Sequence, residues 1–284
     1  MKKIAWIGTG VMGKPMALHL AHAGYEVTVY NRTLEKAKAM EPQVKAVATI
    51  AEAVADADIV FSIVGYPKDV EEVYDTVFQH AKQGTVLVDM TTSSPALAKT
   101  LAAQAESHHM VMLDAPVTGG DLGAINATLS IMVGGPKAQF EKILPLLEKL
   151  GKRITYMGDC GAGQYAKLAN QITIAGAIAG VAEALTFAQA KNLDLTNMLA
   201  VITGGSASSW QAQINGRKMI NHDYAPGFFI KHFLKDLKLV MEEKQEMKLD
   251  IVERVVRIFE TLNDNGFSEN GTQAIIEYYL QKML

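Results

Sequence analysis

The segment that most constrains the fold is Gly8-Thr9-Gly10-Val11-Met12-Gly13, which places three glycines in a GxGxxG pattern near the start of the chain. Residues 3–7 before it have the apolar pattern of a buried strand, and residues 11–23 after it have the pattern of a helix. Between a strand and a helix, the first glycine allows a tight turn, the second lets a pyrophosphate approach the backbone, and the third lets helix and strand pack closely. The motif predicts a dinucleotide site formed by Gly8, Gly10 and Gly13 and by Val11 and Met12 at the helix N-terminus. The alternative is an ordinary glycine-rich turn.

The second strand is expected at residues 26–30 and is followed by Asn31-Arg32-Thr33. An NAD site usually has Asp or Glu at this position, where the carboxylate accepts hydrogen bonds from the adenosine ribose. Asn31 lacks that negative charge, Arg32 offers a guanidinium to a 2′-phosphate, and Thr33 adds a hydroxyl donor. These residues favour NADP, with NAD remaining possible. A plainer interpretation is that they begin and cap the next helix, and both interpretations can hold together.

The composition indicates a soluble protein of two domains. The chain has 284 residues, of which 49% are hydrophobic and 20% charged. A net charge of −3 without a basic run argues against nucleic acid as a partner. Cys160 is the only cysteine, so no internal disulfide can form, and a reducing, cytoplasmic location is expected. The uncharged stretch 168–182 is shorter than the roughly 20 residues of a membrane span, so it predicts a buried helix and no membrane partner.

Strand-like and helix-like segments alternate through the first half of the chain. Strands are expected at residues 3–7, 26–30, 44–47, 59–64, 85–89, 110–114, 129–133 and 154–157. This alternation predicts an α/β Rossmann-type domain with a doubly wound, mostly parallel sheet over residues 1–160. Residues 161–284 have helical patterns only, which predicts an all-α substrate and oligomerisation domain that begins with a long linking helix.

Small and hydroxyl-bearing residues follow three of the expected strands, where a doubly wound sheet binds its ligands. Val64-Gly65 and Thr92 are placed to leave room for a nicotinamide ring. Thr118-Gly119-Gly120 offers one hydroxyl and two unobstructed amides, which suit a carboxylate. The alternative for this last segment is a plain polar loop.

Lys167 and Asn170 are three residues apart in a helical pattern, so they share a face and can reach one ligand. Lys167 lies in an otherwise apolar run, one turn from a helix N-terminus. Desolvation and the helix dipole both lower the pKa of a lysine, toward the range useful for general acid–base catalysis. The alternative is a surface lysine that opens a helix.

The chain resembles the β-hydroxyacid dehydrogenase family, which includes 3-hydroxyisobutyrate dehydrogenase and the glyoxylate and succinic semialdehyde reductases. The resemblance covers essentially the whole chain and rests on four motifs in order: Gly8 to Met16, Asp114-Ala115-Pro116-Val117-Thr118-Gly119-Gly120, Gly163 to Asn170, and Phe233-Leu234-Lys235-Asp236-Leu237. The chain departs from the family pattern at Thr118, where serine is usual, so the added methyl narrows the pocket.

The resemblance implies a role for each matching residue. Lys167 would be the catalytic acid/base, Asn170 would orient the substrate, and Thr118, Gly119 and Gly120 would hold its carboxylate. Thr92 would lie beside the nicotinamide, and Lys235 would close over cofactor and substrate. The implied reaction interconverts a short-chain β-hydroxy acid and its semialdehyde or oxo acid with NADP(H).

Several alternatives remain open. A 3-hydroxyisobutyrate or tartronate semialdehyde enzyme that uses NAD is one, and a non-catalytic NADP-binding module is another. Lys167 argues against an imine reductase, in which this lysine is usually replaced. No metal is expected, because the histidines show no ligand spacing. Gly176 and Gly180 permit close helix contacts, which favours a homo-oligomer, a dimer or tetramer. Trp210 is interpreted as a core residue, with a place beside Ser208 and Ser209 in the substrate pocket as the alternative.

Overall fold

The structure is a computed structural model that describes residues 2–281. The chain forms two compact units, one up to Lys167 and one from Leu168 onward. Each unit has its own hydrophobic core, and each is described by itself.

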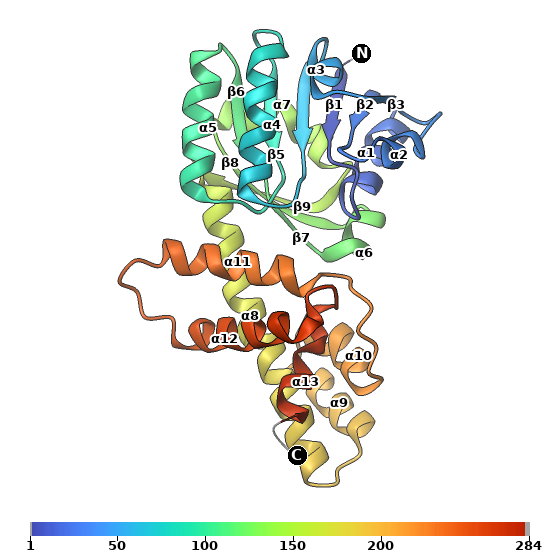
Figure 1. Ribbon diagram of the computed structural model, residues 1–284, viewed down its shortest axis with the longest axis vertical. Helices are drawn as coiled ribbons and strands as arrows, with labels where there is room; N and C mark the ends of the chain where they lie inside the picture. Colours follow the sequence, from blue (N-terminus) through green and yellow to red (C-terminus); the bar gives the residue numbers. More distant parts are fainter. Residues whose placement is uncertain (1, 282–284) are drawn as a thin grey trace. The chain divides into compact units, whose positions relative to one another are not determined.

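The first unit is built on one nine-stranded sheet, whose strands are drawn as arrows among the helices of this unit in Figure 1. The strands are β1 (Lys3–Ile7), β2 (Glu26–Tyr30), β3 (Lys45–Val47), β4 (Ile59–Ser62), β5 (Val86–Asp89), β6 (Val111–Asp114), β7 (Val117–Thr118), β8 (Leu129–Gly134) and β9 (Gly151–Gly158). Their order is β3-β2-β1-β4-β5-β6-β8-β7, with β9 paired to β8. Strands β1 to β6 are parallel, β8 is antiparallel to β6 and β7, and β9 is parallel to β8. The expected doubly wound, mostly parallel sheet is confirmed.

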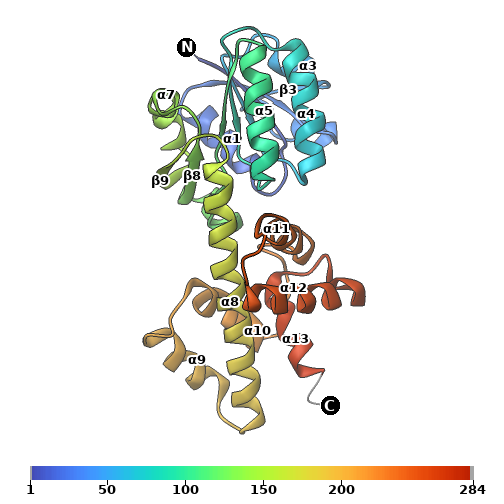
Figure 2. The same ribbon diagram turned by 90° about the vertical axis from the view of Figure 1, so that its left-hand side faces the viewer.

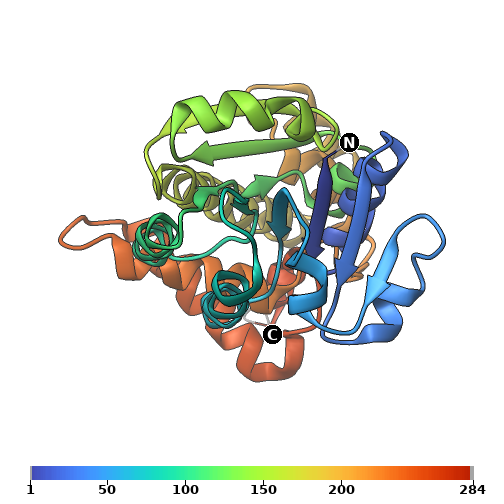
Figure 3. The same ribbon diagram turned by 90° about the horizontal axis from the view of Figure 1, so that it is seen from above.

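Helices cover both faces of this sheet, as Figures 2 and 3 show for the first unit. They are α1 (Gly13–His22), α2 (Leu34–Lys38), α3 (Ile50–Val54), α4 (Pro67–His80), α5 (Pro95–Ser107), α6 (Gly120–Ile125) and α7 (Lys137–Leu147). Alternate residues of each strand face opposite sides, so Ala5 and Ile7 pack with α3, α4 and α5. Ile4 and Trp6 pack with α1, α2, α6 and α7 on the other side. Both faces of the central strands are therefore buried, which explains why β1, β4 and β5 are almost uniformly apolar.

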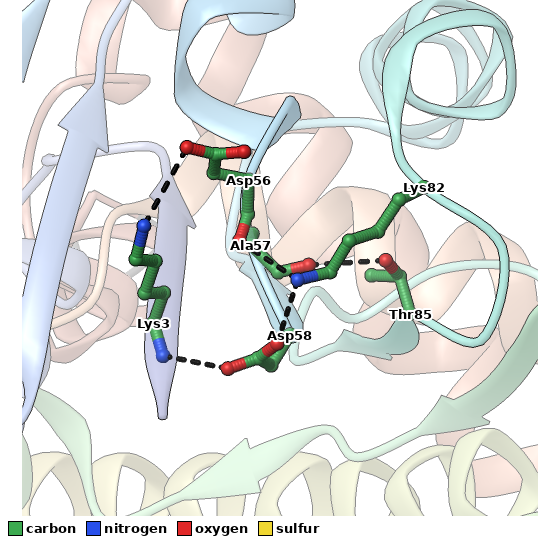
Figure 4. Close-up of polar contacts among 6 residues, drawn as sticks. All are labelled: Lys3, Asp56, Ala57, Asp58, Lys82 and Thr85. Carbon is green, nitrogen blue, oxygen red and sulfur yellow. Dashed lines mark hydrogen bonds and ion pairs between the residues drawn. The ribbon is translucent and has the colours of Figure 1, made fainter. Parts of the chain in front are cut away.

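Charged residues form a network of hydrogen bonds and ion pairs at the amino ends of the central strands, which Figure 4 shows. Lys82 Nζ lies 2.7 Å from Asp58 Oδ1, and the backbone N–H of Lys3 donates to Asp58 Oδ2. The hydrogen bond from Lys82 is the main cause that lowers the pKa of Asp58. Lys3 Nζ also pairs with Asp56 at 3.5 Å. This network lies at the amino edge of the parallel strands, opposite the carboxyl edge where ligands bind in such sheets.

The second unit is helical. Its helices are the greater part of α8 (Ala162–Ala190), which begins in the first unit, and α9 (Leu195–Gly204), α10 (Arg217–Ile220), α11 (Ile230–Glu243), α12 (Asp250–Leu262) and α13 (Ile275–Leu280). Short π-helical stretches occupy Gln211–Gly216 and Asn263–Phe267, and a 3₁₀ turn occupies Thr272–Ala274. Within the described part of this unit, extended pairing is limited to an isolated bridge between Phe229 and Gly271. The expectation of a helical second half is confirmed.

Two sequence interpretations concern single elements of this unit. Helix α8 is long and apolar enough to cross a bilayer by length and composition, and half of its most apolar stretch is buried inside the protein, as in a core helix. Trp210 is 50% exposed and directly precedes the first π-helical stretch. The interpretation of Trp210 as a core residue is therefore wrong.

Candidate active site

The glycine-rich turn between β1 and α1 is tightly packed on one side and open on the other. A Cβ on Gly13 would lie 1.9 Å from the carbonyl oxygen of Gly8, so no larger residue fits there. That same oxygen accepts a hydrogen bond from Trp6 Nε1 at 2.9 Å. A Cβ on Gly10, in contrast, would meet nothing within 4 Å. The close packing of Gly13 and the open approach to Gly10 are the two features that a bound pyrophosphate requires.

The N-terminus of α1 is suited to an anion. Met12 at the N-cap makes no side-chain capping bond, and the first turn of α1 contains no acidic residue. Thr9 Oγ1 is buried without a hydrogen-bond partner among the described residues. Uncapped N–H groups and the helix dipole favour a phosphate here, and the Thr9 hydroxyl can donate to it. The turn thus fits the dinucleotide that its sequence predicts.

Asn31 connects the end of β2 to the glycine-rich turn. Its Oδ1 accepts a hydrogen bond from the N–H of Thr9 at 3.0 Å, and its Nδ2 donates to the carbonyl of Thr33 at 3.0 Å. Thr33 occupies the N-cap position of α2, but its side chain makes no capping bond. The segment therefore begins the helix, while the hydroxyl of Thr33 does not cap it.

Arg32 and Lys36 place positive charge beside this turn. The Arg32 side chain is 88% exposed, with NH1 3.6 Å from Asp69 Oδ1. Lys36 lines a cleft of about 520 Å³ whose walls are Thr9, Gly10, Val11, Lys14, Pro15, Leu18, Lys36, Ala39 and Ile125. Lys36 was not among the residues predicted from the sequence. Lys36 lies on the short helix that follows Arg32, and a second cation only four residues away in the sequence is the signal that could have identified it.

The turns after β4 and β5 are joined by hydrogen bonds. The N–H of Val64 donates to Thr91 Oγ1 at 3.0 Å, and the N–H of Thr91 donates to Asp89 Oδ1 at 3.1 Å. Thr92 is half-buried between the buried residues Thr91 and Ser93. Gly65 lies close to α4, since a Cβ there would be 2.9 Å from Asp69 Oδ2. Val64, Gly65 and Thr92 therefore belong to one connected edge of the sheet.

A row of buried polar side chains lies directly beneath this edge. Ser62, Asp89 and Asp114 are in register on β4, β5 and β6, so their side chains share the face covered by α4 and α5. Ser62 Oγ donates to Asp89 Oδ1 at 2.9 Å and is also 2.9 Å from Tyr74 Oη. Burial raises the pKa of Asp89 to about 6, and burial also raises the pKa of Asp114. This row was not predicted from the sequence.

The segment Thr118-Gly119-Gly120 connects β7 to α6. Gly120 has a φ of +65° and no atom within 4 Å of an ideal Cβ, so its backbone is both left-handed and open. Thr118 is half-buried beside it. His19 Nε2 lies 3.0 Å from the carbonyl oxygens of Ala124 and Ile125, and this contact attaches α6 to α1. The open backbone at Gly120, at the start of a helix that His19 attaches to α1, is compatible with a carboxylate ligand.

Lys167 and Asn170 both belong to α8, one turn apart. Lys167 is a buried lysine with 5% exposure, and it is the last residue of the first unit. Asn170 Oδ1 is buried without a hydrogen-bond partner among the described residues. Buried lysines and unsatisfied amides are uncommon in cores and are typical of functional positions.

Lys235 belongs to α11 in the second unit. Its Nζ lies 3.0 Å from Asp236 Oδ1, and the two side chains are 12% and 2% exposed. Asp236 Oδ2 accepts a hydrogen bond from Gln171 Nε2 at 2.7 Å, which ties α11 to α8. Lys235 was predicted from the sequence, whereas Gln171 and the role of Asp236 were not. The signal for Asp236 was a carboxylate within the apolar run around Lys235.

Comparisons with known proteins cover nearly the whole chain. Residues 3–158 match the NAD binding domain of 6-phosphogluconate dehydrogenase, and residues 161–279 match the NAD-binding family of NADP-dependent 3-hydroxyisobutyrate dehydrogenase. A probable 3-hydroxyisobutyrate dehydrogenase-like protein of Arabidopsis thaliana is 43% identical, over 96% of this chain and 84% of its own. The 2-hydroxy-3-oxopropionate reductase of Escherichia coli is 36% identical, over 97% and 96%. The solved structure of Mycobacterium tuberculosis 3-hydroxyisobutyrate dehydrogenase with L-serine superimposes with a TM-score of 0.90 at 31% identity, over 98% and 99%.

Proposed function

Because the chain belongs to the β-hydroxyacid dehydrogenase family and is an NAD(P)-dependent oxidoreductase, we propose that it interconverts a short-chain β-hydroxy acid and its semialdehyde with NADP(H). The bound nicotinamide supplies or accepts the hydride. The observation that carries the proposal is the burial of Lys167, at 5% exposure, in the unit that also contains the open glycine-rich turn.

Lys167 is the proposed general acid/base. In reduction its ammonium donates a proton to the carbonyl oxygen, and in oxidation its amine accepts the hydroxyl proton. Asn170, one turn further along α8, offers its unsatisfied amide oxygen to orient the substrate. The amides of Gly119 and Gly120 and the hydroxyl of Thr118 hold the carboxylate. Lys235, on α11, is proposed as a further residue that binds cofactor and substrate.

NADP is the preferred cofactor in this proposal. Val64, Gly65 and Thr92 frame the nicotinamide end, and Gly8 to Gly13 hold the pyrophosphate. Arg32 is almost fully exposed, and Lys36 lines the adjoining cleft, so two cations are available to a 2′-phosphate.

Arg32→Asp tests the cofactor preference. The substitution places a carboxylate where the 2′-phosphate is expected, so NADPH should bind much more weakly while NADH binding is largely retained. The measurement is the Kd of each reduced cofactor from quenching of protein fluorescence. Arg153→Asp, an exposed change on β9, is the matched control. Equal weakening of both cofactors by Arg32→Asp would contradict the assignment.

Lys167→Met tests the catalytic assignment, because methionine keeps the length of the side chain and removes the amine. Turnover should fall at least about a hundredfold, the usual lower range for loss of a general acid/base. The Kd for NADPH should stay near that of the wild type. Lys142→Met, an exposed change on α7, is the control and should keep full activity. Near-normal turnover of Lys167→Met would refute the role.

The substrate class is tested by following reduced-nicotinamide absorbance with glyoxylate, succinic semialdehyde, tartronate semialdehyde and 3-hydroxyisobutyrate, each with both cofactors. Turnover of one of these acids with NADP(H) supports the proposal. Turnover of 3-hydroxyisobutyrate or tartronate semialdehyde with NAD only would support the alternative. Cofactor binding without turnover of any of them would favour a non-catalytic NADP-binding module.

The remaining features of the proposal concern the molecule as a whole. We propose a cytoplasmic homo-oligomer whose dinucleotide-binding domain spans 1–160 and whose substrate domain spans 161–284. No group of three or more His, Cys, Asp or Glu residues in the described part of the chain is placed to hold a metal, and the proposed reaction involves none. Light scattering measures the oligomeric state directly.

A further inference from the structure

Helix α8 starts with a carboxylate cap that comes from a distant strand. Asp114, at the end of β6, accepts hydrogen bonds from the N–H of Gly161 at 2.7 Å and from the N–H of Gln164 at 2.8 Å. The Asp114 side chain is buried, and the residues just before α8 (Cys160 and Gly161) offer no side-chain oxygen of their own. A carboxylate at a helix N-terminus pairs unsatisfied N–H groups and is favoured by the helix dipole. Asp114 therefore fixes the first turn of α8 to the sheet.

The backbone around Asp114 is shaped to let this turn approach. A Cβ on Gly163 would lie 2.5 Å from the carbonyl oxygen of Met132 and 2.8 Å from Asp114 Oδ2. A Cβ on Gly134 would lie 2.5 Å from Asp114 Oδ1. The helix start, the carboxylate and β8 thus meet at distances that leave no room for a side chain at either glycine.

The side chain of Gln164 makes a second attachment, to the turn after β5. Gln164 is fully buried, its Oε1 accepts from the N–H of Ser93 at 3.0 Å, and its Nε2 donates to the carbonyl of Thr91 at 2.8 Å. Both ends of the amide are used, and they bind the backbone on the two sides of Thr92. The turn that carries Thr92 and the first turn of α8 consequently share one buried amide.

Lys167 follows Gln164 by three residues, so the two side chains leave neighbouring positions on one face of α8. Rotation or sliding of α8 against the sheet would move Lys167 and would break the bonds of Gln164 and Asp114. We propose that Asp114 and Gln164 are positioning residues, which set the axial position and rotation of the start of α8 so that the Lys167 ammonium meets the substrate next to the nicotinamide that Thr92 frames. This inference rests on the proposed role of Lys167.

Gln164→Leu tests the inference, because leucine keeps most of the volume and removes both side-chain bonds. A displacement of about 1 Å in a reacting group can lower turnover as much as a hundredfold. We expect kcat to fall about ten- to a hundredfold on this basis, with the Kd for NADPH unchanged. Thr85→Val is the matched control: Thr85 is also fully buried in the first unit and donates to the carbonyl of Ala57 at 3.1 Å, at the opposite edge of the sheet (Figure 4). Thr85→Val should lower the melting temperature and leave kcat unchanged.

A double-mutant cycle separates positioning from general destabilisation. If Gln164 acts through Lys167, adding Gln164→Leu to Lys167→Met should cause no further loss of the residual turnover. An additional tenfold loss in that background would overturn the inference, as would a kcat for Gln164→Leu equal to that of Thr85→Val. Asp114→Asn keeps the side-chain volume and one acceptor oxygen, and it provides the same comparison if Gln164→Leu does not fold. Normal turnover of Lys167→Met would refute the proposed function itself. If Lys167→Met loses turnover while Gln164→Leu keeps normal turnover, only the positioning role is refuted.

Discussion

The buried carboxyl of Asp89 should make the stability of the first unit depend on pH. Asp89 is 3% exposed, and burial is the main cause that raises its pKa from the ordinary 3.8 to about 6, against hydrogen bonds from Thr91 and Ser62. A group whose pKa is raised by folding stabilises the fold fully below its unfolded pKa, and this contribution disappears as the pH rises through the folded pKa. Each tenfold difference between the two acid constants corresponds to about 1.4 kcal/mol. A rise from 3.8 to about 6 therefore removes about 3 kcal/mol of stability between about pH 4 and pH 7.

Asp89→Asn isolates this contribution, because asparagine has nearly the same size and does not ionise. The free energy of unfolding in urea can be followed by the fluorescence of Trp6, which is fully buried in the first unit. The other tryptophan, Trp210, lies in the second unit and is replaced by phenylalanine in every variant. The difference in unfolding free energy, variant minus wild type, should increase by about 3 kcal/mol from about pH 4 to pH 7. Asp75→Asn, an exposed change on α4, should show no such trend.

A difference that stays constant across this pH range would refute the reasoning. It would mean that the hydrogen bonds from Ser62 and Thr91 fully offset the cost of burying the charge, so that Asp89 ionises like an exposed carboxyl.

Two further substitutions test the packing of each unit. Gly13→Ala should destabilise the first unit by at least the roughly 1–3 kcal/mol of an overpacked core, because its Cβ would lie 1.9 Å from the backbone oxygen of Gly8. Urea unfolding should show Gly10→Ala to be much less affected, and equal losses would contradict the packing argument. Phe233→Ala should cost about 3–5 kcal/mol, because this ring is fully buried in the core of the second unit. Phe187→Ala, at a ring that is 64% exposed, should cost far less, and thermal unfolding compares the two.

Local patterns in the sequence carry most of the information about the sheet. Residues 4–7 are apolar on both faces, which is the pattern of a parallel strand covered by helices, and β1 is such a strand. Strand β7 contains only Val117 and Thr118, too few residues for any periodicity to be recognised. The π-helical stretch Gln211–Gly216 has no distinctive sequence pattern, and the exposure of Trp210 beside it was predicted wrongly.

Contacts between distant residues could not be predicted in the same way. Asp114 and Gly161 are 47 positions apart, and Gln164 and the Thr91 carbonyl are 73 positions apart. No spacing rule links such residues, because their approach depends on how the whole sheet is assembled. Lys36 differs, since it is close to Arg32 in the sequence. Its charge, two residues into the helix that follows Asn31-Arg32-Thr33, was visible before the structure.

The hydrogen bonds between Asp114 and the first turn of α8 affect how this gene can be divided or recombined. A fragment that ends at residue 160 would contain Asp114 without the N–H groups of Gly161 and Gln164, and would leave a buried carboxylate unsatisfied. Exchange of the helical second half of the chain between relatives also has to preserve these hydrogen bonds. A hybrid joined within α8, beyond Lys167, takes both Asp114 and the helix start from one parent and keeps the native cap. A hybrid joined just before α8, near residue 160, pairs the Asp114 carboxylate of one parent with the helix start of the other.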